Sequence, residues 1–136
     1  TLLKYGLPFH SDWVVECDTS QKQSAEAVAA LLRHNPTISA VVCYNDIIAR
    51  GAWFGLMRAG RQSGEAGMDS YFEQQVTLAA FADVAESALD ELPIIWVTTP
   101  AREMGYTLAE RVMQRIAKED SLARSQTLKA RLIVKK

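Results

Sequence analysis

The chain has 136 residues, of which 49% are hydrophobic and 23% charged, a size and composition typical of one globular domain. No apolar run approaches the ~18–20 residues that cross a membrane, and the first residues lack the pattern of a secretory signal. The net charge of −1 argues against a face that binds DNA by itself, because neutralisation of phosphates supplies most non-specific affinity.

Strands and helices are predicted to alternate along the chain. Apolar runs indicate strands, the spacing of Ala, Val and Leu indicates amphipathic helices, and Gly or Asn-Pro pairs end them. Residues 1–5 have the pattern of a final helical turn that Gly6 ends in a left-handed conformation. The further expected elements are strands at 13–17, 38–44, 76–81, 94–98 and 130–134, and helices at 21–34, 47–59 and 101–118.

This alternation predicts a doubly wound α/β fold with a parallel sheet. Ligands of such sheets bind beyond the carboxyl ends of the strands. The residues expected there are Asp18-Thr19, Tyr44-Asn45-Asp46, Ala82-Asp83 and Thr98-Thr99. Their convergence predicts a single ligand crevice.

Signatures of catalysis are absent from the sequence. It contains no GxGxxG, P-loop, HExxH or GxSxG motif, and His10 and His34 are expected at the surface. Asp46 and Asp83 form a possible acid–base pair, but Asp46 at a helix start is more simply an N-cap. We therefore expect no enzyme, no metal site and no cofactor.

The two cysteines, Cys17 and Cys43, lie in apolar strand-like contexts and form no CxxC motif. We interpret them as small buried residues in a reducing cytosol. The sequence leaves a disulfide between them open.

Four segments together resemble the LacI/GalR family of transcriptional regulators. Residues 40–51, AVVCYNDIIARG, resemble the segment in which a buried strand runs into N-D-x-x-A-x-G at a helix start. Residues 76–83 resemble the strand that ends in G-[YF]-D-[DN], and residues 94–105 the next strand and crossover. Residues 130–134 resemble the closing P-R-L-I/V strand. In order and spacing these pieces cover almost the whole chain.

The resemblance implies a periplasmic-binding-protein-like fold of type I, of which this chain is an incomplete fragment. Such proteins have two similar subdomains with an effector between them, and a helix-turn-helix in front. Residues 1–98 and 128–136 would belong to the C-terminal subdomain, and 100–118 would form the last helix of the N-terminal one. By this resemblance the helix-turn-helix, nearly all of the N-terminal subdomain and the first strand of the C-terminal subdomain, which is normally central in its sheet, would lie upstream of Thr1. We therefore expect residues 1–136 alone not to be a stable monomer.

The resemblance also implies residues for the effector site. They are Asn45, Asp46, Thr19, Asp83 and Thr99, and Thr19 stands where relatives often place an aromatic that stacks on the ligand. The sequence departs from the pattern at Ala82, which replaces the acid that usually binds the effector, and at Ala80 in place of glycine. A missing carboxylate removes charge-assisted hydrogen bonds to sugar hydroxyls, so a crevice that binds nothing tightly stays an alternative.

The function implied is that of a cytoplasmic repressor of sugar genes whose small-molecule effector shifts its affinity for operator DNA. DNA contact would come only through the absent N-terminal domain, and Ile47, Arg50 and Phe54 would take part in a homodimer interface. The alternatives are a periplasmic sugar-binding protein of the ribose type, which shares the fold, and a small α/β enzyme.

Overall fold

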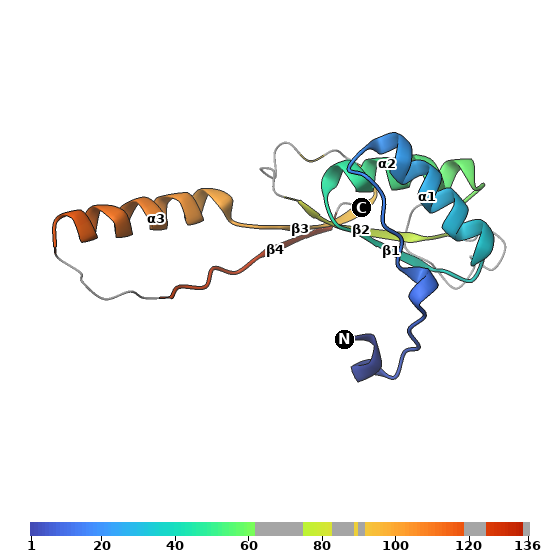
Figure 1. Ribbon diagram of the computed structural model, residues 1–136, viewed down its shortest axis with the longest axis horizontal. Coiled ribbons are helices and arrows are strands. Elements are labelled where there is room, and N and C mark those ends of the chain that lie inside the picture. The colour runs from blue at the N-terminus through green and yellow to red at the C-terminus, as the bar shows by residue number, and fades with distance from the viewer. Residues whose placement is uncertain (62–74, 83–88, 90–91, 119–124, 135–136) are drawn as a thin grey trace.

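The computed structural model describes residues 1–61, 75–82, 89, 92–118 and 125–134 (Figure 1). Two short 3-10 helices, η1 (Leu2–Tyr5) and η2 (Ser11–Trp13), open the chain. The regular elements that follow are α1 (Gln21–His34), β1 (Ala40–Cys43), α2 (Asp46–Arg58), β2 (Thr77–Ala82), β3 (Ile94–Thr98), α3 (Ala101–Ile116) and β4 (Arg131–Val134).

The strands form one sheet in the order β1-β2-β3-β4. β1, β2 and β3 are parallel, with Cys43 opposite Ala80 and Ala80 opposite Trp96. β4 returns antiparallel to β3, and its Arg131 pairs with Thr98. The parallel α/β sheet predicted from the sequence is confirmed.

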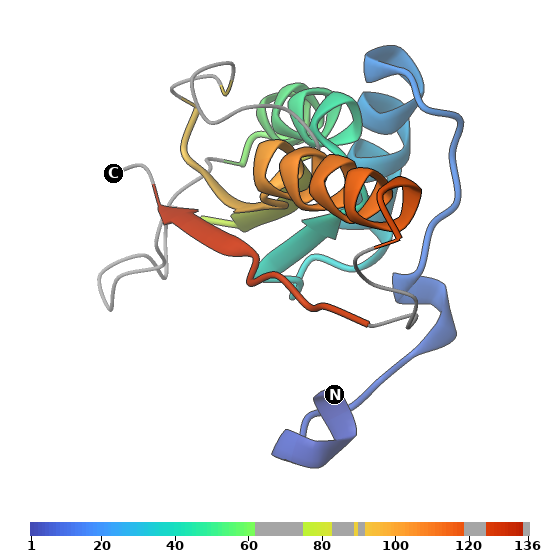
Figure 2. The same cartoon turned by 90° about the vertical axis from the view of Figure 1, so that its left-hand side faces the viewer.

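Helices α1 and α2 pack against each other on one face of this sheet (Figures 1 and 2). The contact is close because α2 carries glycine there. A Cβ on Gly51 would overlap the side chain of Ser24 and the backbone of Gln21, and one on Gly55 would lie 2.6 Å from the carbonyl oxygen of Ala25. Under the two helices lies the core, in which Trp96 and Leu56 have no exposed surface. We call this unit of α1, α2 and the strands β1 to β3 the body.

The opposite face of the sheet is open among the described residues. Alternation turns Cys43, Ala80 and Trp96 toward the helices, and their neighbours Val42, Ala79 and Ile95 the other way. Val42 is 71% exposed and Phe81 52%. In the described part of the chain, no helix covers these side chains.

Residues 13–17 are not the strand that the sequence predicts. Ser11–Trp13 is a 3-10 helix, and Val14 to Cys17 run without a strand partner among the described residues. The backbone of Val14 is extended, as the apolar pattern favours. A strand also requires a neighbour with which to exchange hydrogen bonds, and a local sequence pattern carries no information about it.

Helix α3 stands apart from α1 and α2 (Figure 1). None of its residues is buried. Six large apolar side chains on it are exposed: Met104, Tyr106, Leu108, Val112, Met113 and Ile116. The chain leaves the body at the end of β3 and returns to it at β4. That α3 belongs to another subdomain stays a prediction.

In the described stretches of the chain, no helix has both the length and the apolar character that crossing a bilayer requires.

Candidate functional site

A groove of about 470 Å³ separates β1 from the extended segment that precedes α1. Thr19 and Tyr44 both line it, so the structure brings together two of the strand ends that the sequence singles out. The complete lining is Trp13, Val15, Glu16, Cys17, Thr19, Ser24, Ala27, Val28, Leu31, Val41, Val42, Cys43, Tyr44 and Ile48.

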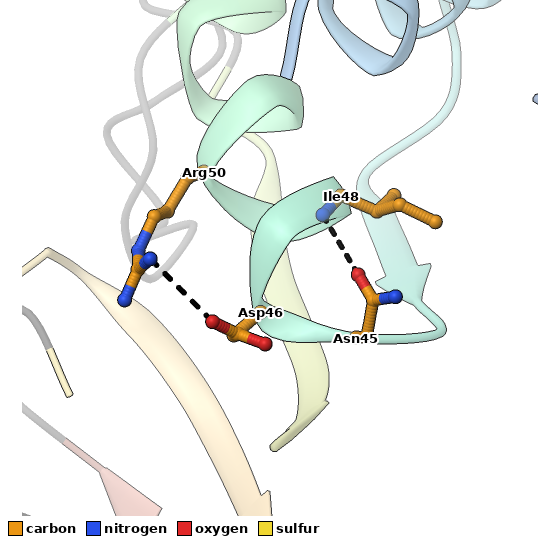
Figure 3. Close-up of polar contacts among 4 residues, drawn as sticks. All are labelled: Asn45, Asp46, Ile48 and Arg50. Atoms are coloured by element: carbon orange, nitrogen blue, oxygen red, sulfur yellow. Dashed lines mark hydrogen bonds and ion pairs between the residues drawn. The ribbon is translucent and has the colours of Figure 1, made fainter. Parts of the chain in front are cut away.

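Asn45 caps helix α2. Its backbone is extended, and its side-chain Oδ1 accepts a hydrogen bond of 2.9 Å from the N–H of Ile48 (Figure 3). An asparagine cap of this kind satisfies one of the free N–H groups of the first helical turn. Its Nδ2 group makes no hydrogen bond to the residues that the structure describes. The amide therefore retains two donors for a ligand.

Asp46 is not the N-cap that the sequence suggests. It is the first residue of α2, and its Oδ2 lies 3.5 Å from Nη1 of Arg50, one turn later (Figure 3). A carboxylate in the first turn is stabilised by the helix dipole. The N-cap falls on Asn45 because its backbone is extended and its side chain accepts the N–H of Ile48 in the first turn, which leaves Asp46 to pair within the helix.

The other predicted site residues are spread more widely. Thr99 is exposed just after β3, and it does not line the groove beside β1. β2 lies between β1 and β3, so Thr99 is two strands away from Asn45. Asp83 lies outside the described residues. Of the predicted strand-end residues, Thr19 and Tyr44 line the groove together, whereas Asn45 and Thr99 do not line it.

The sequence placed Tyr44 at the predicted crevice, but it assigned Trp13 and Glu16 only to a strand. Trp13, Glu16 and Tyr44 line the groove beside Thr19. Tyr44 carried a usable signal, since it is an aromatic residue placed between a buried strand and the Asn-Asp pair. Trp13 and Glu16 carried none, because their place beside β1 depends on contacts that are remote in the sequence.

Both cysteines are free thiols and line the same groove. Burial of Cys43, and secondly the neighbouring charge of Cys17, raises the pKa of the Cys43 thiol to about 11. A thiol with so high a pKa is a poor nucleophile at neutral pH. Cys43 is therefore a packing residue.

The predicted interface residues lie on α2. Ile47 is 38% exposed and Phe54 46%, while Arg50 is paired with Asp46. The ring of Phe54 meets that of Trp53 edge-on, with centroids 5.1 Å apart. Their role in a dimer stays a prediction.

Comparison with known proteins adds close relatives. The chain is 66% identical to the maltose regulon regulatory protein MalI of Escherichia coli (strain K12) over all 136 residues, which is 40% of the length of MalI. Over 117 residues it is 25% identical to the HTH-type transcriptional repressor PurR of Aliivibrio fischeri (strain ATCC 700601 / ES114), covering 85% of this chain and 32% of PurR.

The fold has solved counterparts as well. A LacI family transcriptional regulator from Arthrobacter sp. FB24, solved in complex with lactose, superposes with a TM-score of 0.75 at 19% identity, over 98% of this chain and 45% of that one. The model of periplasmic binding proteins and sugar binding domains of the LacI family matches residues 1–136. The chain therefore belongs to the family of periplasmic binding proteins and LacI-type sugar-binding domains.

Proposed function

We propose that this chain is the effector-sensing part of a cytoplasmic, LacI-type transcriptional repressor that controls sugar genes of the maltose regulon. The observation that carries the proposal is the 66% identity to MalI along the entire chain. The fold alone does not distinguish a repressor from a periplasmic sugar-binding protein, because both kinds of protein share it.

The effector is a sugar, held beyond the carboxyl ends of the parallel strands. The free amide donors of Asn45 and the hydroxyl of Thr19 are groups that bind sugar hydroxyls. Thr99 and Asp83 complete the site in this proposal. Asp46 follows Asn45 and forms an ion pair with Arg50. In this proposal the carboxylate of Asp46 breaks that ion pair and accepts a hydrogen bond from a sugar hydroxyl. The lactose bound by the structural relative from Arthrobacter supports the choice of a sugar.

Operator DNA is bound by a separate N-terminal helix-turn-helix. The net charge of −1 agrees with a chain that does not itself bind phosphates. In this proposal residues 1–98 and 128–136 form one subdomain, and α3 lies on the other. The open apolar side chains of α3 support such a division. The effector changes the relative orientation of the two subdomains and thereby the affinity for DNA.

The active form is a homodimer that uses the exposed side of α2. Ile47, Arg50 and Phe54 are spaced to share one side of a helix, and two of them are partly exposed and apolar. A periplasmic protein of the ribose-binding type would be a monomer, so it would not require an exposed apolar interface on α2. The named relatives that match by sequence are regulators, which also disfavours that alternative.

The proposal is tested by DNA binding of a full-length protein, of the length of MalI, that contains this chain. An operator is selected from random DNA, and its affinity is measured by gel shift with and without a panel of sugars. We expect one sugar to change the DNA affinity about tenfold or more, a coupling of about 1.4 kcal/mol. Asn45→Ala should abolish the response and leave DNA binding intact. Absence of any selected operator would contradict the repressor function.

A further inference from the structure

The path from the body to α3 and the path back to the sheet meet at one place. Thr98 ends β3, Arg131 begins β4, and the register of the sheet puts these two residues opposite each other. The hydroxyl of Thr98 also donates a hydrogen bond of 3.5 Å to the carbonyl oxygen of Arg131. Both paths therefore start from the same end of the sheet, as Figure 1 shows.

An ion pair joins α3 to β4 at this place. Nη2 of Arg131 lies 3.4 Å from Oε1 of Glu103, which stands in the first turn of α3. Arg131 moves with the sheet, because it is paired with Thr98, and Glu103 moves with α3. The ion pair therefore spans the boundary between the two proposed subdomains.

The start of α3 favours this use of Glu103. A glutamate at the third position of a helix commonly reaches back to the backbone N–H of the N-cap residue. The N-cap of α3 is Pro100, which has no N–H. The helix dipole still favours a negative charge in this turn. The carboxylate of Glu103 is therefore stabilised where it stands, and it pairs with the guanidinium of Arg131 in place of a capping bond.

The path to α3 also contains Thr99, one of the proposed effector residues. Thr99 follows Thr98, which is bonded to β4, and its carbonyl oxygen accepts the N–H of Ala101 at 2.8 Å. Ala101 is the first residue of α3. A sugar that binds Thr99 therefore acts on the backbone that positions the first turn of α3 and, with it, Glu103.

We propose that the pair of Glu103 and Arg131 is a hinge latch, an ion pair that stabilises one of the two subdomain orientations between which the effector switches the protein. The inference rests on the proposed sugar-sensing function. The side chain of Arg131 is 63% exposed and that of Glu103 59%, so water screens the pair and its energy is small. A weak contact suits this role, because it shifts the populations of two orientations without locking either of them.

The test is a double-mutant cycle in the full-length protein, with Glu103→Gln, Arg131→Gln and the two together. Affinity for the selected operator is measured by gel shift, without sugar and with D-glucose, D-galactose, maltose or lactose. Each single variant should change the ratio of the affinities with and without sugar by roughly two- to fivefold, in the same direction. The double variant should show no further change, because either substitution alone already breaks the pair.

Two further variants and one further measurement separate the latch from a structural role. Arg131→Lys retains the positive charge and should keep the sugar response within about twofold of the wild type. Glu110→Gln removes another exposed acid about two turns further along α3, and it should leave the response unchanged. Thermal melting is measured for every variant. A merely structural role would lower the melting temperature, whereas the latch changes the sugar response of a protein that melts close to the wild type.

The latch and the proposed function fail in different ways. A wild type whose DNA affinity responds to none of the four sugars overturns the sugar-sensing function and the latch with it. If the wild type responds and both single variants respond equally well, the latch is overturned and the sugar-sensing function stands. Additive effects of the two substitutions, or an equal effect of Glu110→Gln, would show that the charges act separately, which also overturns the latch.

Discussion

Helices α1 and α3 have similar amphipathic patterns and opposite surroundings. Five residues of α1 are buried against α2 and the sheet, whereas α3 has none. On α3, Leu108 is 64% exposed and Val112 53%. An apolar stripe therefore indicates that one face of a helix becomes buried, but it does not identify the element that covers this face. The open stripe of α3 is what the proposed second subdomain would cover.

Truncation of the core tryptophan tests this contrast most strongly. Trp96 has no exposed surface, and its Nε1 has no hydrogen-bond partner in the described structure. Trp96→Ala should lower the free energy of unfolding by about 3–5 kcal/mol through the cavity it leaves. In residues 1–136, the matched change Met113→Ala on α3 should cost less than about 0.5 kcal/mol. Urea unfolding followed by circular dichroism measures both, and equal costs would contradict the open face of α3.

Addition of a single methyl group to two helical glycines gives the next largest effect. Gly51→Ala should destabilise by about 1–3 kcal/mol, because the Cβ overlaps Ser24 and Gln21. Nothing lies within 4 Å of a Cβ on Gly105 in α3. Gly105→Ala should therefore stabilise, by up to about 1 kcal/mol, through helix propensity. Thermal melting compares the two, and a gain in stability from Gly51→Ala would disprove the close contact of α1 with α2.

Loss of the α2 cap should have an effect of about 1 kcal/mol. Asn45→Ala removes the acceptor for the N–H of Ile48, whereas Asn45→Ser retains a good capping group and removes the amide donors. At α3 the N-cap is Pro100, and no side chain forms a cap bond there, so Thr99→Ala should change stability by less than about 0.5 kcal/mol. Thermal melting and sugar titration of Asn45→Ser separate the two roles of Asn45. Full sugar binding by this variant would exclude the amide from the site.

The smallest effect concerns the thiol of Cys43. Its folded pKa of about 11 lies above the ordinary value of 9.0, so its contribution to stability is complete below pH 9 and is lost as the pH rises toward 11. The difference in unfolding free energy between the wild type and Cys43→Ala should shrink over that range. At pH 8 about one Cys43 in a thousand is a thiolate, so iodoacetamide should modify it very slowly in the folded chain. Rapid modification, read by mass spectrometry, would show that the thiol is accessible.

Local signals in the sequence predicted most of the fold. The bounds of α1 and β3 agree with the prediction, because a serine cap, an Asn-Pro stop and a run of apolar residues are all encoded nearby. The strand expected at 13–17 was wrong, because pairing depends on a distant neighbour. At the candidate site, Thr19 lines the groove and Asn45 caps α2, and the binding role that the sequence assigns to both residues stays a prediction. The sequence misassigned the cap to Asp46, since both side chains are good caps and only the backbone geometry decides between them.

The return of the chain to β4 has a consequence for the order of folding. Thr98 and Arg131 are partners in the sheet, and they are 33 residues apart in the chain. Closing a loop of that length costs roughly 3 kcal/mol of entropy, whereas β4 offers four paired residues that are mostly exposed. The parallel strands can assemble with α1 and α2 before that closure occurs. We expect β4 to dock last and to open first, so that its amides exchange hydrogen through a local opening that leaves the core intact.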